Sequence, residues 1–375
     1  MIELKNISKY YKGMERPAVS KLDLHIEKGE ICVFVGPSGC GKTTTMKMIN
    51  RIIEPSDGEI FIDGKNAMDL DPDKLRVDIG YVIQKIGLFP HFTVYENIAV
   101  VPRLKGWKEE KIKHRVTELL EVVGLDPQEN MHKYPNQLSG GQKQRVGVAR
   151  AMAVNPPVML MDEPFGAVDP ITRTQLQNEF LNLQKKIKKT ICFVTHDIDE
   201  AIKMGDKIAI MCDGQLVQYD TPENILFNPA NEFVEEFVGS DRALKVLNLL
   251  KIDSIVENKL PTIIVGTDSE EIKKLYEARK QFVVVLEKNG KLRGYIDVRK
   301  LVDKKNTEKW EQYIKNYQTQ ISEDATFKDA MVEMLQNDVK TIPVLDDDKK
   351  YIGIVNFDMI KSHVGEEYET NVEEE

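Results

Sequence analysis

Residues 31–50 contain the feature that most constrains the fold of this chain. They read "ICVFVGPSGCGKTTTMKMIN", an apolar run followed directly by a glycine-rich loop and a helical pattern. The uninterrupted apolar run is typical of a strand that is buried on both faces of a parallel sheet. The loop fits the pattern GxxxxGK[ST] from Gly36 to Thr43, in which glycines let backbone N–H groups point inward at phosphate. This order of strand, loop and helix predicts an α/β domain built on a phosphate-binding loop.

The loop also contains side chains that suit nucleotide chemistry. Lys42 is expected to reach the β- and γ-phosphates of a nucleotide, and Thr43 is expected to ligate Mg²⁺. A glycine-rich turn without function is the alternative. The apolar strand directly before the loop favours the phosphate-binding interpretation.

A second buried strand ends in two carboxylates. The segment "PVMLMDEP", residues 157–164, places Asp162 where it would hold Mg²⁺ directly or through water. Glu163 follows at a position where a general base could polarise an attacking water. The alternative is a helix N-cap, because acidic residues after a strand often begin a helix. The phosphate loop upstream favours the metal and base roles.

The most specific stretch is "QLSGGQKQR", residues 137–145. Ser139, Gly140 and Gly141 precede a long helical pattern, so they form a second helix start that suits an anion. One phosphate chain cannot lie on two helix starts that are far apart in one subunit. We therefore expect a dimer in which each nucleotide lies between the phosphate loop of one copy and residues 137–145 of the other. A capped helix without this role is the alternative.

The C-terminal third contains an internal repeat. Residues 266–301 are followed 59 positions later by residues 325–360, and both read as strand, helix, two strands and helix. At this fixed offset the following residues match: Thr267 with Thr326, Ile272 with Met331, Leu275 with Met334, Val285 with Val344, and Gly294 with Gly353.

Composition limits the compartment and the partners. The net charge of −9 argues against non-specific binding to nucleic acid, and part of it lies in the acidic tail "EEYETNVEEE". Cys32, Cys40, Cys192 and Cys212 form no CxxC pair, and we interpret them as core thiols in a reducing compartment. No run approaches the roughly 20 apolar residues that span a bilayer. We therefore expect a cytoplasmic protein whose role at a membrane needs a partner that spans it.

With these motifs in this order, residues 1–240 resemble the ATPase subunit of an ABC transporter. The resemblance implies a P-loop NTPase core of the α/β class with antiparallel β and helical subdomains. It also implies a homodimer that binds ATP and Mg²⁺ and works with integral-membrane permease subunits. It assigns nucleotide contacts to Tyr11, Gly36, Ser38, Gly39, Cys40, Gly41, Lys42, Thr43, Thr44, Ser139, Gly141, Gln142 and Asp169.

The same resemblance implies the catalytic and metal-binding residues. The catalytic residues are Lys42, Gln84, Glu163 and His196, and the metal ligands are Thr43, Gln84 and Asp162. Gln84 matches a glutamine that touches Mg²⁺ and water near the membrane subunits. His196, in "VTHD", matches the switch histidine at the γ-phosphate, although a lone histidine after a strand is usually structural.

Two alternatives remain for the adenine contact. Tyr11 matches the aromatic residue that stacks on adenine, and the adjacent Tyr10 is a rival. An exposed strand tyrosine without this role is the other alternative. No core motif is degenerate, so both sites of a homodimer are expected to be competent.

The repeat resembles a tandem pair of cystathionine-β-synthase-type (CBS) domains, a regulatory module that commonly senses adenine nucleotides. The expected boundaries are a linker at 241–260, a CBS pair within 261–375 with repeats at about 261–302 and 320–362, and the acidic tail. In nucleotide-binding examples a Thr or Ser follows the Gly-apolar-apolar step, and an Asp three residues later holds ribose. Here these positions are Asp297 and Lys300, then Asn356 and Met359. This departure leaves open an adenine nucleotide, a different ligand such as cyclic di-AMP, a dimer-interface site or a structural role.

An ABC ATPase followed by two CBS units resembles the ATPase subunits of quaternary amine importers, which take up glycine betaine, carnitine, choline or proline betaine in osmotic adaptation. This implies a subunit at the cytoplasmic face of the membrane that hydrolyses ATP, drives a permease and serves an extracytoplasmic substrate-binding protein through it. Ionic strength or cyclic di-AMP could act through the CBS pair.

Three other functions were weighed against this one. An importer for another solute, such as an amino acid or another osmolyte, has the same ATPase motifs. An ABC ATPase that acts on nucleic acid or ribosomes is disfavoured by the single phosphate loop and the acidic charge. A non-catalytic nucleotide-sensing scaffold is disfavoured by the presence of Lys42, Glu163 and His196.

Overall fold

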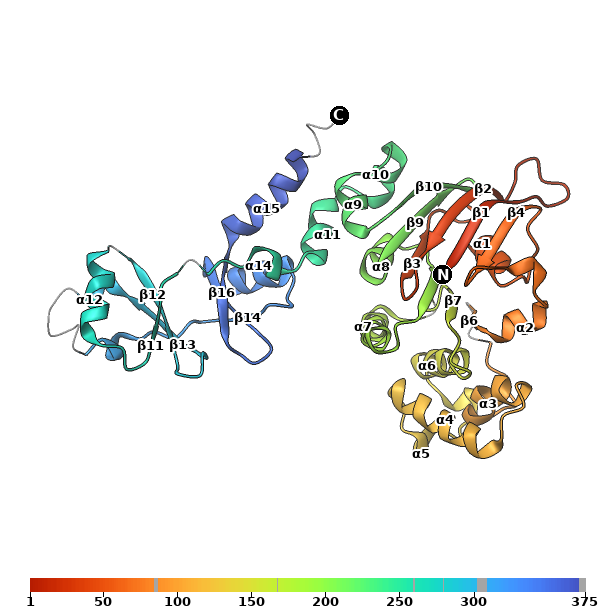
Figure 1. Cartoon of the computed structure of the whole chain (residues 1–375), viewed down its shortest axis with the longest axis horizontal. Helices are drawn as coiled ribbons and strands as arrows, with labels where there is room; N and C mark the ends of the chain where they lie inside the picture. Colours follow the sequence, from red (N-terminus) through yellow and green to blue (C-terminus); the bar gives the residue numbers. More distant parts are fainter. Residues whose placement is uncertain (84–86, 167, 259, 279, 302–308, 371–375) are drawn as a thin grey trace. The chain divides into compact units, whose positions relative to one another are not determined.

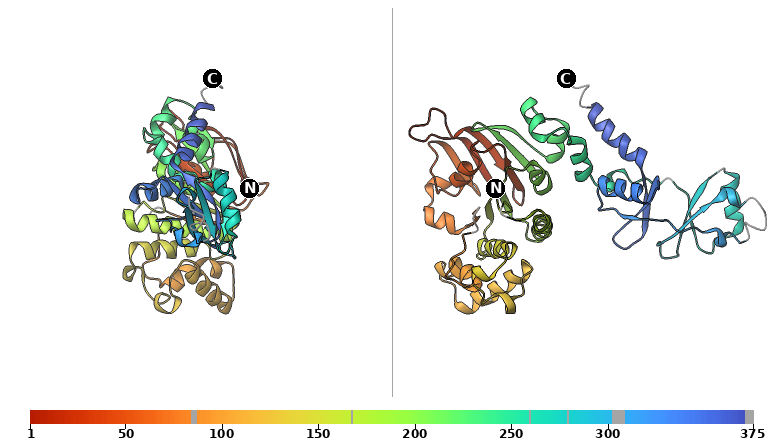
Figure 2. Two further views of the ribbon diagram at one scale, coloured as in Figure 1. Left: turned by 90° about the vertical axis from the view of Figure 1, so that its left-hand side faces the viewer. Right: turned by 180° about the vertical axis from the view of Figure 1, so that it is seen from behind.

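The computed structural model describes residues 1–83, 87–166, 168–258, 260–278, 280–301 and 309–370 of the chain. The chain divides into two units, Met1–Gly239 and Ser240–Glu375. Figures 1 and 2 show the elements of both units, and each unit is described below by itself.

A six-stranded sheet forms the centre of the first unit, with the strand order β10-β9-β3-β8-β7-β6. The pairs from β9 to β6 are parallel, and β10 closes the sheet with an antiparallel pair. Every residue of β3, β7 and β8 is buried, which confirms the expectation of central parallel strands. The strands are β3 (Ile31–Val35), β6 (Ile79–Val82), β7 (Val158–Asp162), β8 (Thr190–Val194), β9 (Lys207–Cys212) and β10 (Gln215–Asp220).

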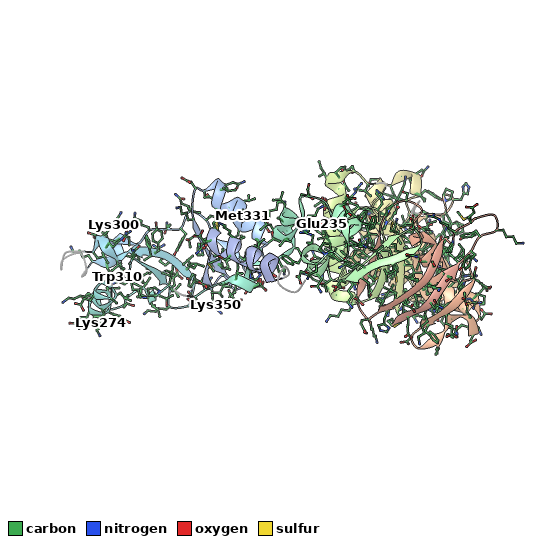
Figure 3. The ribbon with its side chains drawn as sticks, turned by 90° about the horizontal axis from the view of Figure 1, so that it is seen from above. Glu235, Lys274, Lys300, Trp310, Met331 and Lys350 are labelled. Carbon is green, nitrogen blue, oxygen red and sulfur yellow. The ribbon has the colours of Figure 1, made fainter. Side chains whose placement is uncertain are left out.

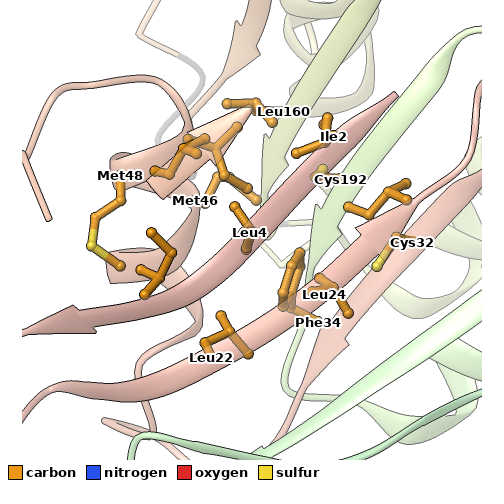
Figure 4. Close-up of a cluster of buried hydrophobic side chains, with 14 of the residues drawn as sticks. Ile2, Leu4, Leu22, Leu24, Cys32, Phe34, Met46, Met48, Leu160 and Cys192 are labelled. Carbon is orange, nitrogen blue, oxygen red and sulfur yellow. The ribbon is translucent and has the colours of Figure 1, made fainter. Parts of the chain in front are cut away.

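A four-stranded antiparallel sheet, ordered β2-β1-β4-β5, forms a second layer. Its strands are β1 (Ile2–Lys9), β2 (Val19–Ile26), β4 (Asp57–Ile62) and β5 (Lys65–Asn66). Figure 4 shows the apolar cluster in which side chains of β1 and β2 pack with Phe34, Leu160 and the helix after β3. Each fully buried apolar side chain of this kind stabilises the packing of the two sheets by roughly 1.5–3 kcal/mol.

Helices surround the central sheet. The helices α3, α4 and α6 lie together at one end of the unit in Figure 1, and α4 buries Ile112, Val116, Leu119 and Leu120 at helical spacing. The short 3₁₀ helices are η1 (Ala67–Asp69) and η2 (Pro135–Gln137). The α-helices are α1 (Lys42–Ile49), α2 (Pro72–Val77), α3 (Val94–Leu104), α4 (Glu109–Val122), α5 (Pro127–Asn130), α6 (Gly140–Ala151), α7 (Pro170–Ile187), α8 (Ile198–Met204), α9 (Pro222–Phe227) and α10 (Glu232–Val238).

The four cysteines are free thiols. Cys32, Cys40 and Cys192 are buried, as expected of core thiols, whereas Cys212 at the end of β9 is partly exposed. Burial raises the pKa of the Cys32 and Cys192 thiols well above the usual range. In the described ranges, no helix combines the length and the apolar character that a membrane span needs.

The second unit contains two three-stranded sheets with the same order, β11-β12-β13 and β14-β15-β16. Trp310, which is labelled in Figure 3, packs in the apolar cluster of the first repeat. Its indole N–H donates to the carbonyl of Thr267 at 3.1 Å. The elements are α11 (Arg242–Leu249), η3 (Ile252–Ile255), β11 (Thr262–Ile264), α12 (Ser269–Glu277), β12 (Phe282–Leu286), β13 (Leu292–Asp297), η4 (Val298–Lys300), η5 (Trp310–Tyr313), β14 (Ile321–Ser322), α14 (Phe327–Gln336), β15 (Thr341–Leu345), β16 (Tyr351–Asn356) and α15 (Phe357–Thr370).

The hairpins of the two repeats share their register. Val285 pairs with Gly294, and 59 positions later Val344 pairs with Gly353, with a bulge at the same place in each hairpin. The offset of 59 residues does not hold at the helix before each hairpin. It equates Thr267 with Thr326, but α12 is capped by Asp268, one residue after Thr267. In the second repeat Thr326 caps α14, so this repeat has one more residue between its cap and its hairpin.

Residues 241–258 are folded and do not form the linker that the sequence predicted over 241–260. Ile252 is fully buried in one apolar cluster with Ile321, Phe327 and Val344 of the second repeat. Its N–H donates to Ala325 O at 3.0 Å, and Phe327 N donates to Leu250 O at 2.9 Å. The apolar positions of α11 and η3 therefore cover this repeat, which explains why the segment belongs to the second unit.

We expect Ile252→Ala to lower the free energy of unfolding of the second unit by about 2–4 kcal/mol, because it leaves a cavity in this cluster. Denaturant unfolding of the full chain measures the change. Leu244→Ala on the exposed side of α11 is the control and should cost less than about 0.5 kcal/mol. Equal effects of the two substitutions would contradict this account of residues 241–260.

Candidate functional site

The candidate site lies in the first unit, where β3, β7 and β8 end. These neighbouring parallel strands direct the loops after them to one edge of the sheet. Asp162 is the last residue of β7, and Thr195 and His196 directly follow β8. The glycine-rich loop after β3 leads into α1, which begins at Lys42.

The glycine-rich loop is tightly folded around the Lys42 side chain. The buried ammonium group of Lys42 donates to Gly36 O at 2.6 Å and to Pro37 O at 2.9 Å. Gly36 has φ 147°, and a Cβ there would lie 2.0 Å from Met211 O. Gly41 has φ 102°, and a Cβ there would lie 2.5 Å from Ala18 O. Only glycine fits these two positions, so the backbone path of the loop depends on them.

Thr43 and Asp162 bring the loop and the end of β7 together. The Thr43 hydroxyl donates to Asp162 Oδ1 at 3.0 Å. Burial raises the pKa of the Asp162 carboxyl, the neighbouring Glu163 carboxylate raises it further, and the Thr43 hydrogen bond works in the opposite direction. Hydroxyl and carboxylate oxygens are the ligands that Mg²⁺ prefers.

The pair fits a Mg²⁺ ion that keeps most of its other ligands from phosphate and water. Among the residues that the structure describes, no group of three or more His, Cys, Asp or Glu side chains could hold a metal ion. Mg²⁺ in nucleotide sites usually takes only one or two protein carboxylates, so two oxygen ligands suffice here.

Glu163 and His196 face each other from adjacent loops. Glu163 Oε1 lies 3.4 Å from His196 Nδ1, and the carboxylate is partly exposed while the imidazole is largely exposed. Glu163 has φ 44°, a left-handed conformation that costs a residue other than glycine about 1–2 kcal/mol. Its N–H donates to Val194 O at 2.9 Å, which holds it beside the end of β8. The arrangement places a carboxylate and an imidazole next to the oxygens of Thr43 and Asp162.

The stretch after residue 137 forms the start of α6. The Ser139 hydroxyl accepts from Gln142 N at 3.2 Å, and Ser139 N donates to Gln142 Oε1 at 2.9 Å. Gly141 is partly exposed within the first turn. Ser139 thus caps α6, and it remains exposed at a helix start that suits an anion.

Asp169 caps α7 in the same manner. It accepts from Thr172 N at 3.0 Å, and this hydrogen bond holds the pKa of Asp169 below its usual range. In the described part of the chain, Ser139, Gly141, Gln142 and Asp169 make no hydrogen bond to the glycine-rich loop.

The remaining predicted residues are the two tyrosines, Gln84 and four residues of the loop. Tyr11 and Tyr10 are both exposed, and Lys9 Nζ lies 5.5 Å from the centre of the Tyr11 ring. Gln84 lies outside the described residues. In the loop itself, Ser38 and Gly39 are exposed, Cys40 is buried and Thr44 is partly buried.

Sequence reasoning missed two features near the site. One is a hollow of about 1000 Å³ whose lining includes Ile83, Phe89 and Leu104, all exposed apolar residues, together with Arg150. The other is a set of buried polar side chains behind His196, including Thr195 and Glu200. No local pattern marks either of them, because the first depends on how α3 and α6 meet the sheet and the second on the packing of α7 on α8.

Comparisons with known proteins agree with this geometry. Residues 19–166 match the family model described as ABC transporter, and residues 319–366 match the model described as CBS domain. The solved dimeric structure of MJ0796, a bacterial ABC transporter cassette, is 38% identical with a TM-score of 0.54, covering 59% of this chain and 99% of that one. A post-hydrolysis state of the same cassette, bound to ADP and Pi, matches at 37% identity. The fold and the site together define an ATPase of the ABC type.

Relatives match the chain over nearly its whole length. The "Glycine betaine/carnitine/choline transport ATP-binding protein OpuCA" of Bacillus subtilis is 49% identical over 95% of this chain and 94% of its own. The "Osmoprotectant import ATP-binding protein OsmV" of Salmonella typhimurium is 42% identical over 97% and 96%. The chain therefore belongs to the ABC transporter family, and these relatives are named as ATP-binding proteins of glycine betaine, carnitine, choline or osmoprotectant transport.

The opposite pKa shifts of two aspartates give a test of the site's electrostatics. The raised pKa of Asp162 means that its charged form is disfavoured in the folded chain, so the stability that its neutral form provides is lost as the pH rises above the unfolded value. We expect Asp162→Asn to raise the Tm of the chain at pH 7 without nucleotide and Mg²⁺. Asp169→Asn should lower it, because the charged form of Asp169 is favoured. Shifts in the same direction, measured by thermal unfolding, would contradict these assignments.

Proposed function

We propose that this chain hydrolyses ATP to drive the import of a quaternary amine compatible solute, such as glycine betaine, carnitine, choline or proline betaine, through a membrane permease. The observation that supports this most strongly is the hydrogen bond between Thr43 and Asp162, with Glu163 and His196 beside it, in a chain whose full-length relatives are named for such transport. An importer for another osmolyte would use the same site. No feature of this chain favours it over the quaternary amines that the relatives' names state.

The residues of the loop would bind the substrate. Lys42 would release its two loop carbonyls and donate to the β- and γ-phosphates, with the backbone of Gly36 to Gly41 around them. Ser38, Cys40 and Thr44 would add contacts from the same loop. Thr43, Asp162 and Gln84 would hold Mg²⁺, which neutralises charge that develops on the phosphate oxygens.

Glu163 would act as the general base. Its partly exposed carboxylate can accept the proton of an attacking water, and the strained backbone fixes its direction. His196, 3.4 Å away, would contact the γ-phosphate and orient the carboxylate. Tyr11, or Tyr10 beside it, would stack on the adenine ring.

The chain would work as a homodimer. The exposed start of α6 with Ser139, Gly141 and Gln142 has no hydrogen bond to its own loop within the described residues, so it is available to the nucleotide of a second copy. Asp169 at the start of α7 would contribute to the same interface. The dimeric form of the similar cassette MJ0796 supports this arrangement.

The permease would dock at the hollow between α3 and the sheet. Leu104 is 75% exposed and Phe89 is 46% exposed, an unusual state for apolar side chains unless a partner covers them. This contact would place the chain at the cytoplasmic face of the membrane. An extracytoplasmic substrate-binding protein would act through the permease, and nucleic acid would not be a partner.

The second unit would regulate this cycle through its CBS pair. Asp297 is paired with Arg299 at 2.9 Å, and the Asn356 side chain accepts from Met359 N at 2.8 Å, so both positions serve their own repeat. Lys300 can only donate, and Met359 offers no more than a weak thioether acceptor to ribose hydroxyls. AMP and ATP carry a free 2′,3′-diol, whereas the 3′ oxygens of cyclic di-AMP are part of its phosphodiesters, so we place cyclic di-AMP ahead of AMP or ATP as the ligand. The boundaries would be 1–240 for the ATPase and 241–375 for the regulatory unit.

Replacement of the proposed base gives the most direct test of hydrolysis. Glu163→Gln should lower kcat by at least about 100-fold and leave ATP binding intact, so that the variant collects as an ATP-bound dimer. Steady-state hydrolysis and size-exclusion chromatography with ATP measure the two effects. Glu121→Gln on the exposed side of α4 is the control. A normal rate in Glu163→Gln would show that Glu163 is not the base.

Calorimetry of the full chain tests the regulatory ligand. Lys42→Ala weakens the ATPase site, so binding of cyclic di-AMP, AMP or ATP to this variant reports on the CBS pair. We expect one of the three, cyclic di-AMP first, to bind with a defined stoichiometry. If none binds, and none changes the ATPase rate of the wild-type chain, the proposal of a nucleotide at the CBS pair is wrong.

A further inference from the structure

A hydrogen bond from α6 holds one wall of the hollow that lies between α3 and the sheet. Arg150, in the last turn of α6, donates from Nη1 to Gly87 O at 2.7 Å. Its guanidinium carbon also lies 5.9 Å from the centre of the Phe89 ring. The contact thus combines a hydrogen bond from a charged donor with a cation–π contact. Phe89 is 46% exposed at the hollow, whereas Arg150 is partly buried.

Helix α3 holds the same segment, residues 87–92, at a second place. Asn97 is fully buried, and its Oδ1 accepts from Phe89 N at 2.8 Å. Its Nδ2 donates to Phe92 O at 3.0 Å. Because α3 packs against α6 (Figure 1), the segment is fixed to two helices that lie together. A movement of these helices would therefore carry the segment with them.

The end of α6 is anchored on the central sheet. A Cβ at Gly80 of β6 would lie 2.6 Å from Ala151 O, so only glycine lets the last turn of the helix lie this close to the strand. Arg150 directly precedes Ala151, whereas the opposite end of the helix begins after the exposed Ser139. A turn of α6 about its anchored end would therefore change the direction in which the long Arg150 side chain points.

Gly87 lies where the chain passes from the sheet to these helices. A Cβ there would lie 2.5 Å from Cδ1 of Ile83, the residue that follows β6, and 3.8 Å from Arg150 Nη2. Gly87 also has φ 54°, a left-handed conformation that favours glycine. Arg150 thus bonds to the carbonyl of a residue that lies between the sheet and α6, where a movement of one against the other would be felt.

We propose that Arg150 is a positioning residue that couples the start of α6 to the wall of the hollow where the permease would dock. When Ser139 engages the nucleotide of the second copy, α6 turns about its anchored end, and Arg150 moves Gly87 and Phe89 with it. The inference rests on the proposed function, which supplies the nucleotide at one end of α6 and the permease at the other. It assigns the contact between the two to a single side chain.

The ratio of solute taken up to ATP hydrolysed tests this coupling. Arg150→Lys keeps the positive charge, but an ammonium group cannot present one planar face to the Phe89 ring while it bonds to Gly87 O. The full chain is assembled with the permease and the substrate-binding protein that the proposed function requires. The complexes are purified through the permease and placed in proteoliposomes, so that every variant is measured in an intact complex.

We expect Arg150→Lys to lower this ratio by about tenfold for whichever of the four proposed solutes the wild-type complex takes up. The reason is that hydrolysis continues while the wall of the hollow no longer follows α6. An arginine that only stabilised the fold would lower hydrolysis and uptake together, and the ratio would not change.

Arg115→Lys is the matched control. Arg115 on α4 also holds the end of α6, because it donates to Met152 O at 3.0 Å and to Ala153 O at 3.2 Å. It lines a different hollow, together with Trp107, and makes no contact with the segment 87–92 in the described part of the chain. Its substitution should therefore keep the ratio within about twofold of the wild type.

Gly87→Ala serves if Arg150→Lys fails to fold. It retains Arg150, but the new Cβ meets Ile83 and strains the left-handed backbone, which displaces the carbonyl from the guanidinium group. This variant should lower the ratio by at least about fivefold.

The outcomes distinguish this inference from the proposed function. A ratio within about twofold of the wild type in Arg150→Lys, or in Gly87→Ala where only that variant folds, would overturn the coupling role of Arg150 while the proposed function stands. An equal fall in Arg115→Lys would overturn it in the same way. A wild-type complex that hydrolyses ATP but takes up none of the four solutes would overturn the proposed function and the inference with it.

Discussion

The parallel register of three strands is the constraint on which the rest of the site depends. Phe34 of β3 pairs with Val194 of β8, and Val194 also pairs with Asp162 of β7, so the three strands end at the same level of the sheet. Each strand then delivers one part of the site: the glycine-rich loop, the two carboxylates, and the loop with His196. Since β3, β7 and β8 are buried on both faces, a slip of one residue would turn each side chain to the opposite face, disrupt its packing and separate these parts.

The same register explains how polar groups and the fold support each other. Thr43 and Asp162 meet across two elements, and Glu163 bonds to the carbonyl of Val194, so the chemistry relies on backbone positions that the apolar core fixes. The buried carboxylate of Asp162 and the left-handed backbone of Glu163 both cost stability in the free chain. Such local costs are common at functional sites, where binding of the substrate offsets them.

The sequence predicted the central part of this site because its signals are local. A buried strand that runs into a glycine-rich loop specifies the positions of Lys42 and Thr43. The buried strand that ends at Asp162 specifies the edge of the sheet at which this residue lies. The buried hydrogen bond between Gln177 and Glu200 could not be predicted, because it depends on how α7 packs on α8. In the second unit, the repeated hairpin could be predicted from the matching positions of Val285 and Val344. The capping of α12 by Asp268 and the burial of Ile252 could not, because they depend on tertiary contacts.

Simultaneous measurement of ATP hydrolysis and solute uptake tests the central claim most directly. The chain is reconstituted in proteoliposomes with the permease and the substrate-binding protein that the proposed function requires, and labelled glycine betaine, carnitine, choline and proline betaine are supplied in turn. The account predicts that at least one of these solutes accumulates only while ATP is hydrolysed, and that Lys42→Ala abolishes both activities together. The account would be contradicted if Lys42→Ala still took up a solute. It would also be contradicted if the wild-type chain hydrolysed ATP but took up none of these four solutes.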